Sequence, residues 1–323
     1  MMMVLLLILC ISIFIHFYNN TVIETPTVQK KMKVLTPEWG VAATLVNIGS
    51  PPHAVGSERI YSKYYPNTPL PVSVIDVGLR GQPNMELMAQ LDSDVTIDTN
   101  FYDFTRQYYG AHTQVTTVDF GIISNQEKSL PNLSVYTQAV LDIGNAIHHP
   151  KATKNYLSNA LSTIKADGDF IKSKLGNERQ YFVTSFASNT QLQSYGINHP
   201  VALAAKLMGL DLITFGKTNI QGYATLPLDR LYDLPENTCL ILVDPITTLD
   251  RYEIPRSPIW QRSPFYHSNA CLYKIDPVWS RGGFNTLNVF SENLRKAVTT
   301  QTISEFSYEY LTTKGFDKKK VNK

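Results

Sequence analysis

Short apolar runs rich in β-branched residues alternate with segments of helical periodicity along most of this 323-residue chain. The clearest case is the stretch from Ser73 to Met88, SVIDVGLRGQPNMELM, in which a strand ends near Gly78 and a helix begins after Pro83. Repeated units of this kind predict an α/β fold with open sheets. In such sheets ligands bind beyond the carboxyl ends of the strands, where the loops converge. Arg80 lies at such an end, although a solvated loop cation would fit the sequence equally well.

The length of the chain predicts two lobes, because 323 residues exceed what a single hydrophobic core usually organises. The strand and helix pattern runs from residue 32 to 150 and restarts at residue 176. Between these parts, residues 151–175 have amphipathic spacing, which predicts one helix of about 25 residues, roughly 37 Å long. Periodicity alone fits either a rigid spacer or an ordinary layer helix. We expect an N-terminal α/β lobe at 32–150, a linking helix at 151–175 and a C-terminal α/β lobe at 176–298.

Four further local predictions concern the surroundings of these elements. The tyrosine-rich segment Tyr61–Tyr65 is expected to be a loop, serving either as one wall of a binding cleft or as ordinary surface. Thr116–Ile123 is expected to be a strand and Leu226–Tyr232 a short helix. Residues 299–323, which include a run of lysines, are expected to form a solvated tail.

The first 31 residues predict export rather than part of the fold. The segment MMMVLLLILCISIFIHFY has the length of a signal peptide and is short for a membrane span, and a polar linker follows it. No basic residue precedes the apolar run, no typical cleavage site follows it, and LILC ending at Cys10 loosely resembles a lipoprotein cleavage box. We therefore expect a periplasmic protein, and an uncleaved or lipidated membrane anchor stays open as an alternative. A buried helix of the fold is disfavoured because the segment has no polar face.

Charge and cysteine content exclude several classes of function. The net charge of +2, without a basic stripe carrying interleaved aromatics, argues against nucleic-acid binding. The three cysteines have no zinc or redox spacing. Cys239 and Cys271 each begin an apolar run ending in Asp-Pro, so they could lie side by side at the starts of neighbouring strands. Free buried thiols are the favoured interpretation, and a disulfide is the alternative.

No catalytic or nucleotide-binding motif is present in the sequence. The segment Gly216-Lys217-Thr218 lacks the upstream glycine of a phosphate-binding loop, and the adjacent His148 and His149 have no partners at metal-ligand spacing. The residues that look functional are Arg80, Tyr102 and Trp279, a set better suited to holding a ligand than to moving protons. We therefore expect a binding protein with no resident metal or cofactor.

Several short segments in both halves carry a recognisable pattern: WGVAATL at 39–45, LPVSVIDVGLR at 70–80, PNMEL at 83–87, TN at 218–219, LDRL at 228–231 and PVW at 277–279. Together they resemble the ferric-hydroxamate (ferrichrome-type) periplasmic binding proteins of ABC importers, over roughly residues 33–298. The resemblance implies the class III binding-protein fold, in which two Rossmann-like α/β lobes are joined by one long helix with a shallow cleft between them. It also implies capture of a ferric siderophore, in which iron enters only as part of the ligand.

The resemblance assigns ligand contacts to particular positions. Arg80 and Tyr102 match an arginine and a tyrosine that hydrogen-bond the hydroxamate oxygens around the iron. Trp279 matches a cleft aromatic of the second lobe, and Tyr64 falls where the family often has a tryptophan. Gln221 departs from the pattern, because a pocket tryptophan is expected there. The remaining candidate, Tyr223, could substitute for that ring.

The resemblance also names a partner, the inner-membrane ABC permease. Glu86 and Asp229 match acidic positions on the tops of the lobes that meet permease arginines, although ordinary acids on a helix surface would fit as well. We expect a monomer that captures a ferric siderophore, of the hydroxamate type, and delivers it to the importer. The alternatives are a citrate-type ferric siderophore, haem or a corrinoid as ligand, and an exported enzyme or an anchored adhesion protein as function.

Overall fold

The computed structural model describes residues 32–121, 129–266, 270–300 and 306. From Met32 on, the chain forms one compact unit. The predicted signal or anchor segment and most of the predicted tail therefore fall outside the described residues. Among the residues that are described, no helix is both long and apolar enough to span a bilayer.

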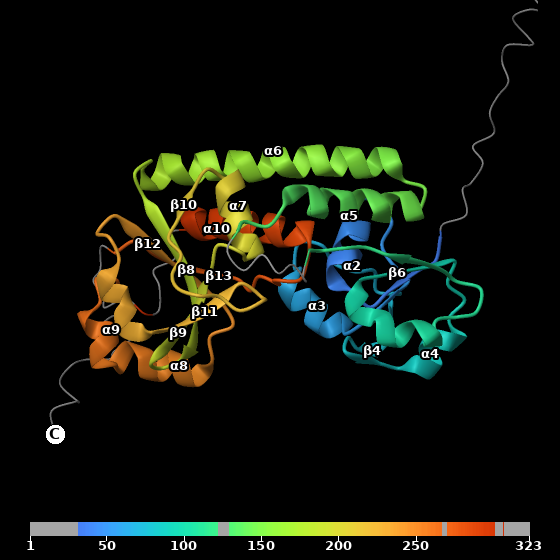
Figure 1. Ribbon diagram of the computed structural model, residues 1–323, viewed down its shortest axis with the longest axis horizontal. Helices are drawn as coiled ribbons and strands as arrows, with labels where there is room; N and C mark the ends of the chain where they lie inside the picture. The colour runs from blue at the N-terminus through green and yellow to red at the C-terminus, as the bar shows by residue number, and fades with distance from the viewer. Residues whose placement is uncertain (1–31, 122–128, 267–269, 301–305, 307–323) are drawn as a thin grey trace, which may run out of the picture. The chain divides into compact units, whose positions relative to one another are not determined.

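The first sheet has five parallel strands in the order β3-β2-β1-β6-β7 (Figure 1). Its strands are β1 (Val34–Thr36), β2 (Ala54–Val55), β3 (Ile75–Asp76), β6 (Val95–Asp98) and β7 (Gln114–Thr117). The chain adds strands on one side of β1 and then crosses to its other side, so the order reverses between β1 and β6. The loops after these two strands diverge at this switch point, which is where open α/β sheets leave room for a ligand.

Helices connect the strands of the first sheet: α2 (Trp39–Asn47), α3 (Glu58–Tyr64), α4 (Met85–Gln90), the 3₁₀ helix η1 (Asn100–Tyr108) and α5 (Leu133–Ala146). The predicted loop at Tyr61–Tyr65 is wrong, because α3 covers most of it and Tyr61 and Tyr65 are buried. The predicted strand Thr116–Ile123 is displaced: β7 is Gln114–Thr117, and Val118 and Phe120 enter the core instead, while residues 122 and 123 lie outside the described residues. The apolar side chains of Val118 and Phe120 suggested a longer strand.

The second sheet is mixed and has the order β11-β9-β8-β12-β13, with β10 also beside β8. Its strands are β8 (Gln180–Ser188), β9 (Gln191–Tyr195), β10 (Asp211–Leu212), β11 (Tyr223–Pro227), β12 (Thr238–Val243) and β13 (Leu272–Ile275). β9 and β11 run antiparallel to their neighbours. The predicted helix Leu226–Tyr232 is therefore wrong over its first residues, which belong to β11; the 3₁₀ helix η2 (Leu228–Asp233) follows.

Four further helical segments complete this part: α7 (Pro200–Leu207), α8 (Thr248–Glu253), η3 (Ile254–Arg256) and α9 (Pro258–Arg262). Trp260 of α9 is fully buried and its Nε1 donates to the carbonyl of Phe306, 2.9 Å away. Phe306 is itself buried beside Trp260. The prediction of a solvated tail is therefore wrong at this position, where an aromatic ring covers the core.

The predicted long helix is confirmed as α6 (Pro150–Leu175), and the chain's last helix is α10 (Phe284–Thr300). α6 packs on α5 beside the first sheet and on α7 and α10 beside the second (Figure 1). Gly168 permits this contact, because a Cβ there would lie 1.9 Å from the Met208 carbonyl oxygen at the end of α7. The glycine that weakens an isolated helix is required here by close packing.

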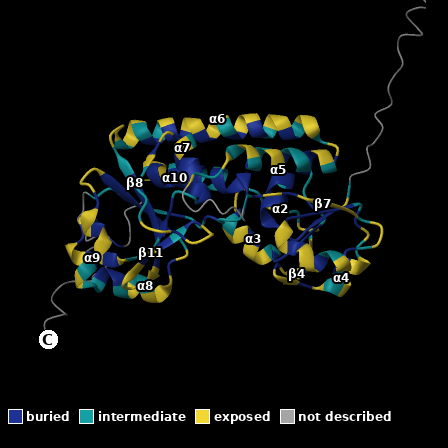
Figure 2. Ribbon diagram, viewed as in Figure 1, coloured by how far each residue is buried: buried dark blue, intermediate teal, exposed yellow. Residues whose placement is uncertain are grey.

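The apolar faces of both sheets are buried under these helices, and α2 is buried along most of its length (Figure 2). Cys239 lies on β12 and Cys271 directly precedes the paired strand β13, side by side as expected, and the two form a disulfide. The favoured interpretation of free thiols is therefore wrong. Sequence alone could place the two cysteines side by side but could not settle whether they were bonded.

Candidate ligand-binding site

Two strand ends of the first sheet and the turn of a separate two-stranded hairpin bring Glu38, Arg80 and Tyr102 together, a group we call the strand-end cluster. Glu38 follows β1, Tyr102 follows β6 and Arg80 lies in the turn between β4 (Gly78–Leu79) and β5 (Gln82–Pro83), which form an antiparallel hairpin after β3. Nη1 of Arg80 donates to both carboxylate oxygens of Glu38, at 3.1 and 3.0 Å. The Tyr102 hydroxyl donates to the carbonyl oxygen of Pro37, at 2.9 Å. The cluster thus lies at the switch point between β1 and β6.

The backbone of the β4–β5 hairpin fixes the position of Arg80. Gly78 has a φ of +88°, a left-handed conformation that glycine adopts without the Cβ penalty. Its carbonyl accepts a hydrogen bond from the Ser57 amide, and the Ser57 hydroxyl accepts one from the Arg80 amide, at 2.7 and 3.0 Å. The Val-Gly-Leu-Arg run noted in the sequence therefore forms a tight turn that positions Arg80 at the edge of the sheet.

Aromatic rings enclose the guanidinium of Arg80. Its Cζ lies 4.7 Å from the ring centroid of Trp279, 5.2 Å from those of Trp39 and Phe101, and 5.8 Å from that of Tyr102. Arg80 is 9% exposed and Glu38 is fully buried. A buried cation is stabilised by ring faces and by a carboxylate partner, whereas an unpaired one would be costly.

Burial and charge act in opposite directions on these groups. Burial lowers the pKa of Arg80. The neighbouring Glu38 carboxylate and the Tyr102 oxygen raise it, and together these effects outweigh burial, so the net shift is upward. Burial and then the Glu38 charge raise the pKa of Tyr102 well above its usual range. At neutral pH the cluster therefore holds a permanent cation and a protonated phenol, both hydrogen-bond donors.

A cavity of about 480 Å³ adjoins the cluster and falls in the range of small-molecule sites. Trp279 lines this cavity and also lies over Arg80, whereas Arg80 itself does not line it. Tyr64 lines the same cavity, with its ring 5.2 Å from that of Trp279. Nε1 of Trp279 is buried and, within the described residues, has no hydrogen-bond partner. This N–H group is available to a ligand that displaces the Trp279 ring or extends along it.

Three rings on the second-sheet side, Tyr195, Tyr223 and His199, form what we call the aromatic wall. Tyr195 and Tyr223 lie on the paired strands β9 and β11 and line the cavity, with ring centroids 5.1 Å apart. Burial raises the pKa of Tyr223, although hydrogen bonds with Ser280 and Tyr195 lower it in part.

His199 supports the two tyrosines from behind. Its ring is fully buried, with centroids 4.6 Å from Tyr195 and 4.9 Å from Tyr223. Its Nδ1 accepts from the Val201 amide and so caps α7. Burial lowers the pKa of His199 to about 3, so the ring is neutral at physiological pH. The aromatic wall is therefore uncharged.

The predicted site residues divide into three groups. Tyr64, Tyr223 and Trp279 line the cavity. Arg80 and Tyr102 do not line it; Nη1 of Arg80 is bonded to Glu38, and the Tyr102 hydroxyl is bonded to the Pro37 carbonyl. Gln221 is exposed in the turn before β11, where its amide donates to Asn219 Oδ1, and it does not line the cavity.

Both predicted permease-contacting acids are on the surface. Glu86 is exposed on α4 and accepts a long hydrogen bond from Gln90, while Asp229 is exposed in η2. Their roles stay predictions.

Sequence reasoning missed Glu38, Trp39 and Phe101. Glu38 had a readable signal, because it follows the first strand and parallel strands end at the same sheet edge. The rings of Trp39 and Phe101 gave no such signal, since their approach to Arg80 depends on how α2 and η1 fold back over the strand ends. The aromatic pairing across β9 and β11 was missed because neither strand was predicted.

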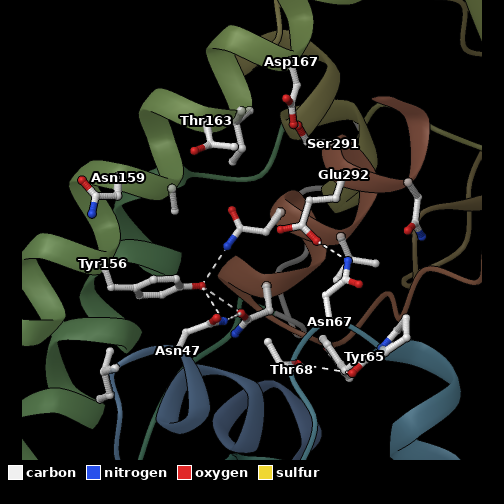
Figure 3. A pocket seen from close by; sticks show the side chains of 18 of the residues that line it. Asn47, Tyr65, Asn67, Thr68, Tyr156, Asn159, Thr163, Asp167, Ser291 and Glu292 are labelled. Carbon is white, nitrogen blue, oxygen red and sulfur yellow. Dashed lines mark hydrogen bonds between the residues drawn. The ribbon is translucent and has the colours of Figure 1, made fainter. Parts of the chain in front are cut away.

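A second cavity, of about 500 Å³, lies among α2, α6, α10 and the segment after α3, and its lining is rich in asparagine (Figure 3). The Tyr156 hydroxyl donates to Asn285 and accepts from Asn288, at 2.9 and 2.8 Å. Asn67 donates to Glu292 at 2.9 Å. The Tyr156 bonds join α6 to α10, and the Asn67 bond joins the segment after α3 to α10. Among the described residues, no group of three or more His, Cys, Asp or Glu could hold a metal ion.

Residues 34–277 match the model of the periplasmic binding protein family, which covers more than half of the chain. The chain belongs to this family. It is 22% identical, over 251 residues, to the iron(3+)-hydroxamate-binding protein FhuD of Escherichia coli, covering 77% of this chain and 81% of that protein.

Two solved structures show the same fold. The siderophore-binding protein FhuD from Vibrio cholerae, bound to Fe³⁺-Desferal, has a TM-score of 0.71 and 18% identity, covering 83% of this chain and 98% of the other. The iron uptake ABC transporter substrate-binding protein PiuA from Streptococcus pneumoniae has a TM-score of 0.62 and 13% identity, covering 82% and 92%. The fold implied by the sequence resemblance is therefore confirmed.

Proposed function

We propose that this protein captures a ferric siderophore, of the hydroxamate type, and delivers it to an ABC importer for iron uptake. The observation that carries the proposal is a buried arginine at the sheet switch point, in contact with a tryptophan that lines an aromatic cavity. The relationship to an iron(3+)-hydroxamate-binding protein supports the same ligand class. The chain would act as a carrier and not as an enzyme, with iron arriving inside the ligand.

The donors of the strand-end cluster suit hydroxamate oxygens. Oxygens bound to Fe(III) keep partial negative charge, and a guanidinium is a planar, permanently charged donor for two such acceptors. Both hydrogen bonds from Arg80 to Glu38 use Nη1, so Nη2 and Nε make no hydrogen bond within the described residues. We expect Trp279 to turn aside as the ligand enters, which exposes these donors. The aromatic wall then contacts the ligand's methylene backbone.

The elements around the cavity fit a two-lobed carrier. We propose residues 32–150 and 176–298 as the lobes and 151–175 as the helix that holds their spacing. Glu86 and Asp229 would present one carboxylate from each lobe to basic residues of the inner-membrane permease. We propose a monomer in the periplasm, exported by its first residues or anchored through them.

Titration with ferrichrome and ferrioxamine B, followed by tryptophan fluorescence, tests the ligand class. Trp39 and Trp279 lie beside Arg80, so a bound ferric complex should quench their emission. Trp260 is buried in the second-sheet core, and a Trp260→Phe variant should keep the ligand-induced loss of signal. Quenching by haem or a ferric citrate-type chelate, with none by either hydroxamate, would instead favour the alternative ligands.

A further inference from the structure

A second arginine reaches the same aromatic cluster from the other half of the chain. Arg281 follows Ser280, which lines the cavity. Its Cζ lies 5.2 Å from the ring centroid of Phe101, the same separation that Arg80 has from that ring. Phe101 is 40% exposed, so this contact is open to solvent, unlike the buried pair of Arg80 and Glu38.

The two arginines differ in their ionic partners. Arg80 is neutralised by Glu38. Arg281 is half-buried, and among the described residues it forms no ion pair or hydrogen bond; its guanidinium lies over the Phe101 ring. A guanidinium placed in this way keeps its charge and its donors for an incoming group.

The acidic residue of the cavity does not cancel this charge. Asp244 lines the cavity, but Arg251 and Lys274 bind it at 3.3 and 3.5 Å. Arg281 also lies close enough to Tyr223 for its charge to lower the pKa of that hydroxyl, although burial has the larger, opposite effect. Arg281 thus places a positive charge, without an ionic partner among the described residues, near Tyr223, which lines the cavity.

We propose that Arg281 makes the site selective for ferric chelates that carry a negative charge outside the iron sphere, a carboxylate above all. The proposal rests on the proposed function and narrows its ligand class. A carboxylate accepts two parallel hydrogen bonds from a guanidinium, and partial burial strengthens the pair relative to water. A cationic tail at the same place would be repelled.

A ligand series with one iron centre and three tail charges tests the proposal. Ferric complexes of desferrioxamine B can be prepared with the terminal amine free, acetylated or succinylated, giving a tail that is positive, neutral or negative. Dissociation constants are measured for the full-length protein and its Arg281→Gln and Arg281→Lys variants. Arg262→Gln, which changes an exposed arginine of α9, is the matched control.

The wild type and Arg262→Gln should bind the succinylated complex about tenfold more tightly than the free-amine complex, as expected for a charged hydrogen bond gained on one ligand. Arg281→Gln should bind all three within about a factor of two, and Arg281→Lys should keep part of the preference. Raising the ionic strength should weaken the preference in the wild type.

An unchanged order of affinities in Arg281→Gln, or tightest binding of the free-amine form by the wild type, would overturn the selectivity while leaving the proposed function intact. Failure of the wild type to bind any of the three would overturn the proposed function and the selectivity with it.

Discussion

Trp279 adjoins both the strand-end cluster and the aromatic wall: its ring lies over Arg80, and it lines the same cavity as Tyr223. The cluster is built from a charged pair that the fold has removed from water. The wall is built from neutral rings that pack on one another across an antiparallel strand pair. Buried charges demand an exact partner, whereas stacked rings tolerate change. Substitutions should therefore have large and specific effects in the cluster, and smaller, graded effects in the wall.

The largest effect is expected from Glu38→Gln. Removing the carboxylate leaves Arg80 as a buried cation without a charged partner, which should lower the free energy of unfolding by about 3–5 kcal/mol. Urea unfolding followed by circular dichroism measures this change. Glu86→Gln is the matched control, because Glu86 is exposed, and it should stay within about 0.5 kcal/mol of the wild type. Equal stability of the two variants would show that the buried pair is not what holds the cluster.

The wall should respond to acid through His199. Its pKa in the folded protein is about 3, below the unfolded value, so the unfolded chain binds more protons between pH 6.5 and 3. Stability should fall with decreasing pH in this range, and His199 alone should contribute a loss of about 2 kcal/mol at pH 5 relative to pH 7.5.

The variant His199→Asn keeps a side-chain acceptor for the cap of α7 and removes the titrating ring. Unfolding curves at pH 7.5 and 5 should show a smaller acid-induced loss in this variant than in the wild type, by that same amount. Carboxylates titrate in both proteins, so the difference isolates His199. Identical acid sensitivity would mean that the ring is not kept neutral by burial.

The smallest effects are expected in ligand affinity at the wall. Tyr223→Ala removes a ring that lines the cavity and should weaken binding of a ferric hydroxamate by about tenfold, in keeping with the loss of one aromatic contact. Gln221→Ala should change affinity by less than about twofold, because this side chain is exposed outside the cavity. Fluorescence titration of both variants measures the contrast. A larger loss of affinity in Gln221→Ala than in Tyr223→Ala would show that Gln221 contacts the ligand.

The cluster was largely predictable from the sequence, and the wall was not. A local run from Val77 to Pro83 sets the turn that returns Arg80 to the sheet edge, and strand ends of a parallel sheet necessarily meet there. The long helix α6 was equally readable, because its periodicity persists over seven turns. These features depend on residues close together in the chain.

The wall depends on contacts between distant segments with weak local signals. β9 and β11 have mixed polar sequences, and Gln221 seemed important only because a tryptophan was expected at its position. Tyr223, two residues on, lies on a paired strand and lines the cavity. The Cys239–Cys271 bond was similarly the less favoured alternative in the sequence, since its geometry is set by strand pairing between β12 and β13. In each case the deciding information is three-dimensional.

The central claim is that Arg80 contacts a ferric hydroxamate from the sheet edge, and its removal tests that claim most directly. Arg80→Ala alone would leave Glu38 as a buried, unpaired acid, so the double variant Glu38→Leu/Arg80→Met is measured beside it, with circular dichroism to confirm folding. Dissociation constants for ferrioxamine B should rise by about 30-fold or more in both, equivalent to roughly 2 kcal/mol for a charged hydrogen bond in a pocket. A folded double variant that binds with the wild-type dissociation constant would contradict the account.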